Sequence, residues 1–138
     1  MEYVEKENVI LTKTYDFAIR IVRLYQYLCK EKKEYELSKQ VLRSGTSIGS
    51  NVEESVGGLS RKDFLAKLGV SYRETRETHY WLRLLRDTDY ISAEQAQSML
   101  NDLLKLDFIR SHIFNNRASD NFRMAFYKRF SKFNKHFC

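Results

Sequence analysis

The side chains that could carry out chemistry are few, and their spacing does not suit catalysis. Glu74 and Glu77 stand three residues apart, but the next histidine, His79, falls on another face of a helix. A carboxylate-bridged metal site in a helical bundle needs Glu-x-x-His pairs on facing helices instead. The sequence contains no H-E-x-x-H or C-x-x-C motif and no Gly-rich phosphate loop. We therefore expect no metal site, no cofactor and no enzymatic activity.

The polar residues of one Gly- and Ser-rich stretch, residues 40–55, are the second candidate site. One set has the spacing of a single helical face and consists of Val41, Gly45, Ile48 and Val52. A polar stripe lies about 135° round the same helix and consists of Arg43, Ser47, Asn51 and Glu54. Three interpretations remain open for this stripe: a solvated helix face, a set of hydrogen bonds to another helix or subunit, and a ligand site.

Helices must position these residues. Apolar spacing predicts a loose lead-in over residues 1–12, a helix over about 14–33 and a second helix over about 38–56. Ser38 is the expected N-cap of the second helix, and Ser50-x-x-Glu53 resembles a capping box, so that helix is expected to kink or restart near Gly49. Its small residues should let a neighbouring backbone come close.

Two further helices are predicted after the Gly57-Gly58 stop. Ser60 should cap the third, which ends before a turn at 87–90, and Ser92 should begin the fourth with a capping box. The third helix carries small hydroxyl residues on its apolar face, and we expect some of these to be buried and hydrogen-bonded to the preceding turn or to a neighbouring helix. The face consists of Phe64, Leu68, Ser71, Thr75, Thr78, Leu82 and Leu85.

The positive charge is concentrated at the C-terminal end. Residues 1–116 carry 18 basic and 17 acidic residues, whereas residues 117–138 carry six basic and one acidic, and the whole chain has a net charge of +6. We divide the chain accordingly into a bundle domain, 1–116, and a C-terminal extension, 117–138. The basic residues of the extension, which we predict to bind nucleic acid, are Arg117, Arg123, Lys128, Arg129, Lys132 and Lys135.

The same extension has an uninterrupted helical stripe of aromatic residues. They are Phe122, Phe126, Phe130, Phe133 and Phe137. The stripe is compatible with a fifth helix packed on the bundle or on a neighbouring subunit, which we favour because burying a Phe is worth ~2 kcal/mol or more. Stacking of nucleic-acid bases on exposed rings and binding to a membrane surface or a partner's groove are the alternatives.

Three segments in order resemble a known family. The first is Arg43-Ser44-Gly45-Thr46-Ser47-Ile48-Gly49-Ser50-Asn51-Val52-Glu53-Glu54, and residues 62–68 and 74–85 follow it. They resemble the bacterial four-helix-bundle family, also called 23S rRNA intervening-sequence proteins, over roughly residues 13–110. The resemblance implies an all-α, up-down four-helix bundle that forms ring-like homopentamers. The C-terminal extension, predicted to be a basic amphipathic helix, departs from this family.

The resemblance favours a structural role for the polar stripe. Asn51 and Glu54 are then expected to bond across a helix–helix or subunit interface, to Arg43 or to Arg73 of a neighbour. The predicted structural and interface residues are Arg43, Ser47, Asn51, Glu54, Glu74, Glu77 and Trp81. Relatives that serve as accessory factors in diversity-generating retroelements bind RNA and a reverse transcriptase, so the resemblance implies such partners here by analogy.

These observations predict a non-enzymatic homo-oligomer, a pentamer by resemblance, that binds nucleic acid, RNA before DNA. The alternative is a protein-interaction scaffold with no nucleic-acid role. The sequence holds no apolar run long enough to span a membrane, and its two cysteines form no disulfide framework, so a cytoplasmic location is expected.

Overall fold

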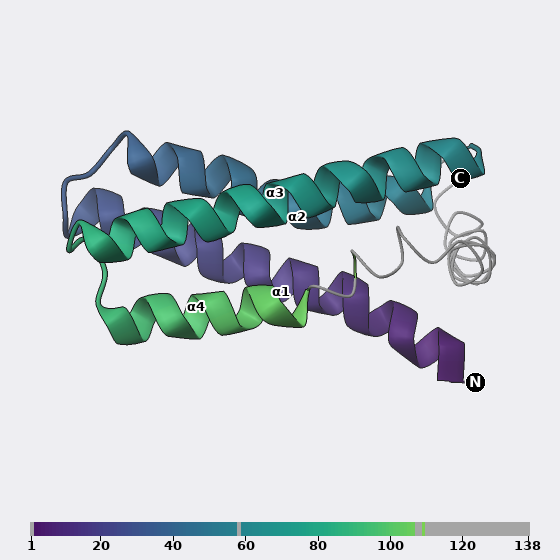
Figure 1. Ribbon diagram of the computed structural model, residues 1–138, viewed down its shortest axis with the longest axis horizontal. Coiled ribbons are helices and arrows are strands. Elements are labelled where there is room, and N and C mark those ends of the chain that lie inside the picture. Colours follow the sequence, from purple (N-terminus) through teal and green to yellow (C-terminus); the bar gives the residue numbers. More distant parts are fainter. Residues whose placement is uncertain (1, 58, 107–108, 110–138) are drawn as a thin grey trace.

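The computed structural model describes residues 2–57, 59–106 and 109, with side chains described from residue 10 onward. It consists of four helices in up-down order: α1 (Glu2–Lys30), α2 (Leu37–Val56), α3 (Arg61–Asp87) and α4 (Ala93–Lys105). Figure 1 shows α2 and α3 side by side, with α1 and the shorter α4 beside them. The predicted all-α bundle is confirmed, and the described residues form no strand. The C-terminal extension, 117–138, lies outside the described residues.

Helix α1 begins at Glu2, so the prediction of a loose lead-in over residues 1–12 is wrong. No glycine or proline occurs before Phe17, and the buried stripe of Phe17 and Ile21 continues backward through Thr14 to Ile10, which is 4% exposed. Burial of this stripe therefore favours extension of the helix by at least one more turn towards the N-terminus. It also ends at Lys30, before the predicted end at 33.

The start of α2 is capped by a residue that the sequence pattern did not indicate. Ser38 is fully buried inside the helix, and Glu34 performs the capping from the preceding loop. The Glu34 carboxylate accepts hydrogen bonds from the backbone N–H groups of Glu36, Leu37 and Ser38 at 3.0, 2.8 and 2.7 Å. Lys33, at φ 53°, turns the chain so that Glu34 faces these donors.

Helix α2 runs without a break through Gly49, so the predicted kink or restart there is wrong. The Ser50 hydroxyl donates to the Ser47 carbonyl at 3.2 Å, within the helix, and does not act as an N-cap. The predicted close approach of a neighbour is correct. A Cβ at Gly45 would lie 2.6–2.8 Å from side-chain carbons of Ile21, and one at Gly49 would lie 3.2 Å from the Thr14 carbonyl oxygen. These glycines let α1 pack tightly on α2.

Helices α3 and α4 begin as predicted. Ser60 accepts a hydrogen bond from the backbone N–H of Asp63, and Ser92 forms a complete capping box with Gln95. Both signals lie within four residues of sequence and need no tertiary contact.

The core lies between the four helices. Its largest fully buried side chains include Ile21, Leu28, Ile48, Phe64, Leu68, Leu82 and Leu85. Helix α4 packs chiefly on α3 and meets α1 more loosely. Within the part of the chain described, no helix combines the length and apolar character needed to cross a membrane.

Candidate interaction site on helices α2 and α3

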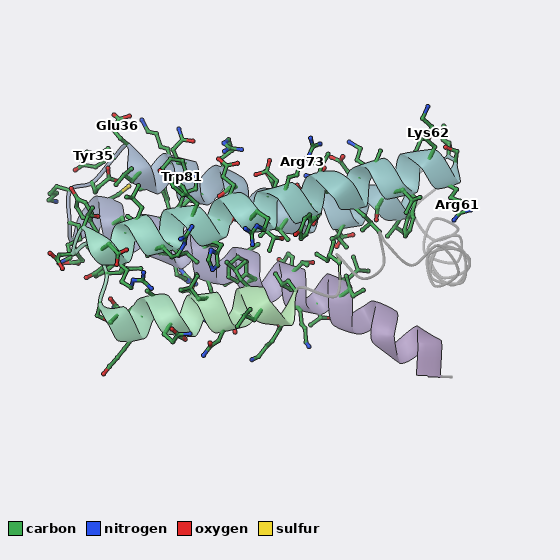
Figure 2. The ribbon with its side chains drawn as sticks, in the orientation of Figure 1. Tyr35, Glu36, Arg61, Lys62, Arg73 and Trp81 are labelled. Carbon is green, nitrogen blue, oxygen red and sulfur yellow. The ribbon has the colours of Figure 1, made fainter. Side chains whose placement is uncertain are left out.

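Arg43 joins α2 to α3 through two carboxylates. Its Nη1 lies 3.4 Å from Glu74 Oε2, and its Nη2 pairs with Glu77 Oε1. Trp81 Nε1 donates to the same Glu77 oxygen at 3.2 Å. The structure thus brings four of the predicted interface residues into one cluster, hereafter the Arg43 cluster (Arg43, Glu74, Glu77 and Trp81). Figure 2 labels Trp81 on α3, on the side of the bundle that faces away from α4.

The Arg43 cluster is partly open to solvent. Half of the Arg43 side chain is exposed, whereas the Glu74 side chain is 18% exposed. Burial raises the pKa of the Glu74 carboxyl and the neighbouring Glu77 raises it further, while Arg43 acts in the opposite direction. Two carboxylates around one guanidinium leave no excess positive charge for a phosphate. The cluster is therefore suited to holding helices or subunits together by polar contacts around an aromatic ring.

Tyr80 extends this surface beyond Trp81. The two rings make an edge-to-face contact with centroids 5.0 Å apart, and Tyr80 is 49% exposed. Exposed aromatic rings beside half-buried charges are typical of protein–protein contact surfaces. The sequence pattern did not single out Tyr80, because it lies outside the buried face of α3.

The rest of the polar stripe forms two kinds of contact. Glu54 pairs with Lys67 of α3 at 2.6 Å. Asn51, however, donates from Nδ2 to the Ser47 carbonyl at 2.7 Å, one turn back on its own helix. Ser47 likewise donates to the Arg43 carbonyl at 2.6 Å. The prediction that Asn51 bonds to another helix of the bundle is therefore wrong, since an Asn one turn from a free carbonyl lone pair is satisfied locally.

A layer of buried hydroxyls lies beneath the Arg43 cluster. Thr78 Oγ1 lies 2.9 Å from Ser44 Oγ and donates to the Glu74 carbonyl, 2.8 Å away. Ser71 Oγ donates to the Ile48 carbonyl of α2 at 2.8 Å. The expectation of buried, hydrogen-bonded hydroxyls on this face of α3 is confirmed. These contacts fix the register of α2 against α3 and so position Arg43 opposite Glu74.

Sequence reasoning missed one polar link, between α1 and α4. Arg20 pairs with Asp102, and its Nη2 donates to Ser98 Oγ at 3.0 Å. The partners are about 80 residues apart and each resembles an ordinary surface residue in the sequence. No local signal could have paired them.

Three observations concern the side chains that could bind a metal ion or take part in catalysis. No cluster of ligands suited to a metal ion occurs among the described residues. Cys29 is partly buried, with its thiol 3.7 Å from the Ser38 hydroxyl, as expected of a packed thiol. Burial lowers the pKa of His79, and the nearby Arg83, Arg76 and Arg86 add to this. Both effects favour the neutral form of the His79 imidazole.

The predicted nucleic-acid-binding residues are not placed by the structure. Arg117, Arg123, Lys128, Arg129, Lys132 and Lys135 all lie outside the described residues. Their role stays a prediction.

Comparison with known proteins identifies the bundle. The crystal structure of a protein with unknown function from the S23 ribosomal protein family of Bacteroides thetaiotaomicron VPI-5482 is 47% identical to this chain, with a TM-score of 0.78. The match covers 80% of this chain and 99% of that one. Among curated proteins no match was found. The model of the 23S rRNA-intervening sequence protein family matches residues 6–109. This chain belongs to the 23S rRNA-intervening sequence protein family.

Proposed function

We propose that this protein is a non-enzymatic homo-oligomer, a pentamer, that binds nucleic acid, RNA in preference to DNA. The observation that carries the proposal is the charge asymmetry: nearly all of the net charge of +6 lies in residues 117–138. The family name, which refers to 23S rRNA, favours RNA. Within the bundle, several of the basic residues are already paired, Arg20 with Asp102, Arg43 with Glu74 and Glu77, and Lys67 with Glu54.

The proposed binding predicts a salt dependence that four extension residues control. Replacing Lys128, Arg129, Lys132 and Lys135 by Gln should weaken binding to single-stranded RNA of mixed sequence. It should also flatten the slope of log affinity against log salt by ~0.7 for each phosphate that the protein no longer neutralises, because fewer counterions are released. Fluorescence anisotropy at several salt concentrations measures both quantities.

A matched control removes the same charge from the bundle. Its four substitutions, all at exposed positions, are Lys13→Gln, Lys32→Gln, Lys39→Gln and Lys62→Gln. This control should keep most of the wild-type salt slope. Equal losses of affinity in the two variants would show that the charge acts without regard to position. Absence of binding by the wild-type protein at low salt would instead favour the scaffold, with a protein partner such as a reverse transcriptase.

The proposed assembly predicts a particle several times the mass of one chain. Light scattering at micromolar concentration should give five times 16.5 kDa. A closed ring repeats one heterologous contact and leaves no free interface, and the Arg43 cluster with Tyr80 is the surface we assign to that contact. Trp81→Ala should reduce the mass, whereas Leu104→Ala, at an exposed apolar residue of α4, should not. A wild-type mass of 16.5 kDa would contradict the assembly.

A further inference from the structure

An apolar strip runs along α1 on a side of that helix that α2, α3 and α4 cover only in part. Tyr15, Ile19 and Val22 are 65%, 44% and 37% exposed, and with Ala18 they have the i, i+3, i+4, i+7 spacing of one helical face. We call these four residues the α1 strip. A contiguous exposed apolar face of this kind commonly marks a surface that something covers.

The α1 strip is hollowed along its length. A hollow of about 600 Å³ lies between α1 and the first part of α4, lined by Ile19, Leu24 and Met99 among others. A second hollow, of about 340 Å³, shares Ile19 and Arg23 with the first. A third, of about 280 Å³, shares Tyr15 and Ala18 with the second and reaches Glu53 of α2. Together the hollows follow α1 from Thr14 to Tyr27, a length of ~20 Å at 1.5 Å per residue.

We propose that the α1 strip and its hollows are the docking site for the aromatic stripe of this chain's own C-terminal extension. The stripe consists of Phe122, Phe126, Phe130, Phe133 and Phe137. At about 100° per residue these five positions fall within an arc of ~80° on a helix, and residues 122–137 would form a helix ~24 Å long. The ~80° arc is close to the ~100° arc of the α1 strip, and the length is close to the ~20 Å over which the hollows follow α1.

The direction of the chain favours this occupant. Arg20 contacts Ser98 and Asp102, while Tyr27 and Ile91 line the same hollow, so α1 and α4 run antiparallel. The end of α4 therefore lies beside the part of α1 that precedes Arg20, where the α1 strip begins (Figure 1). The last described residue, Ile109, is 1% exposed and belongs to the core. The twelve residues from 110 to 121 can span up to ~40 Å, about twice the ~20 Å over which the hollows follow α1.

The comparisons with known proteins favour the same occupant. The related crystal structure matches only 80% of this chain, and the family model ends at residue 109. A segment additional to the family bundle thus has an apolar face that matches a partly uncovered surface on that bundle.

Docking would orient the basic side chains of the extension outward. On the same helical projection Lys128, Lys132 and Lys135 fall on the side opposite the aromatic stripe. The docked helix would cover its Phe rings and present its lysines to solvent, which excludes base stacking on those rings. The docking itself does not depend on nucleic-acid binding and is tested without it.

Limited trypsin digestion of the full chain tests the docking. In the double variant Ile19→Asp, Val22→Asp, cleavage after Lys128, Arg129, Lys132 and Lys135 should be at least tenfold faster than in the wild type. Leu104→Asp is the matched control, because Leu104 is 68% exposed and lines none of the three hollows, and it should leave the rate unchanged. Circular dichroism checks that both variants keep their helices. Equal cleavage rates in the double variant and the wild type would overturn the proposal.

A photo-crosslinker identifies the occupant. Benzoylphenylalanine at Val22 should form its main crosslink to a peptide from residues 122–137. Mixing isotopically heavy and light chains before irradiation shows whether both ends belong to one chain, as the proposal requires. Crosslinks to residues 10–106 of a second copy, crosslinks to the extension of a second copy, or no crosslink at all would each contradict docking within the chain.

Discussion

Gly45→Leu should lower the free energy of unfolding by about 3 kcal/mol, measured by urea denaturation followed by circular dichroism. The reason is the contact between α1 and α2. A Cβ at residue 45 alone would lie 2.6–2.8 Å from three carbons of Ile21, and the Ile21 side chain is fully buried. Since Ile is branched at Cβ and stiff at χ1, it cannot turn away, and the helices must separate instead.

Two alanine substitutions isolate this contact from helix propensity. Gly69 lies inside α3, and a Cβ there would meet nothing within 4 Å. Gly69→Ala should therefore stabilise the protein by ~0.5–1 kcal/mol through propensity. Gly45→Ala has the same gain in propensity but should destabilise the protein because of Ile21. If both substitutions raised stability equally, the close approach of α1 to α2 would be refuted.

The sequence predicted those parts of the fold that depend on short-range patterns. The Ser60 and Ser92 caps and the stop at Gly57 each rest on residues within about one turn of one another, and all three appear in the structure. The Gly45 and Gly49 spacing also indicated that a backbone would come close. It did not indicate which helix, because small residues permit an approach without specifying the partner.

The errors have a common physical cause. Serine is a preferred N-cap residue, yet Ser38 lies fully buried inside the helix and Glu34 caps the helix from the loop. Whether Ser38 or Glu34 reaches the free N–H groups depends on the backbone of the loop, including the positive φ of Lys33. Similarly, the extent of α1 depends on the burial of Ile10 against the bundle, a tertiary effect that overrides a weak local pattern.

The residues predicted to form one site do not all contact one another in the structure. Arg43 and the pair Glu74 and Glu77 were grouped through the family resemblance, and the structure places them in contact across 31 to 34 residues of sequence. Asn51 was assigned to the same set but bonds within its own helix. A helical projection gives the direction of a side chain, but it does not say whether the nearest acceptor belongs to another helix or to the preceding turn.

Glu34→Ala should lower the free energy of unfolding at pH 7 by about 2–3 kcal/mol. The substitution removes the acceptor for three backbone N–H groups at the start of α2, one of which, on the buried Ser38, has limited access to water. Glu36→Ala is the matched control, because Glu36 is exposed and caps α2 without a side-chain hydrogen bond. Figure 2 labels it in the α1–α2 loop. Its effect should stay within about 0.5 kcal/mol.

The pH dependence of the free energy of unfolding distinguishes the contribution of the Glu34 charge from that of its hydrogen-bonding shape. Burial alone would raise the pKa of the Glu34 carboxyl, but the backbone N–H groups of Leu37, Ser38 and Glu36, with the Ser38 hydroxyl, outweigh it and hold the pKa below its ordinary value. A lowered pKa contributes stability that is fully present above the unfolded-state value of about 4.3 and is lost as the pH falls through the folded-state pKa. Glu34→Gln keeps an acceptor but no charge, so its deficit relative to the wild type should be greatest near pH 7 and should shrink below about pH 4. A deficit that stays constant from pH 7 to pH 3 would show that the carboxylate charge does not stabilise the start of α2.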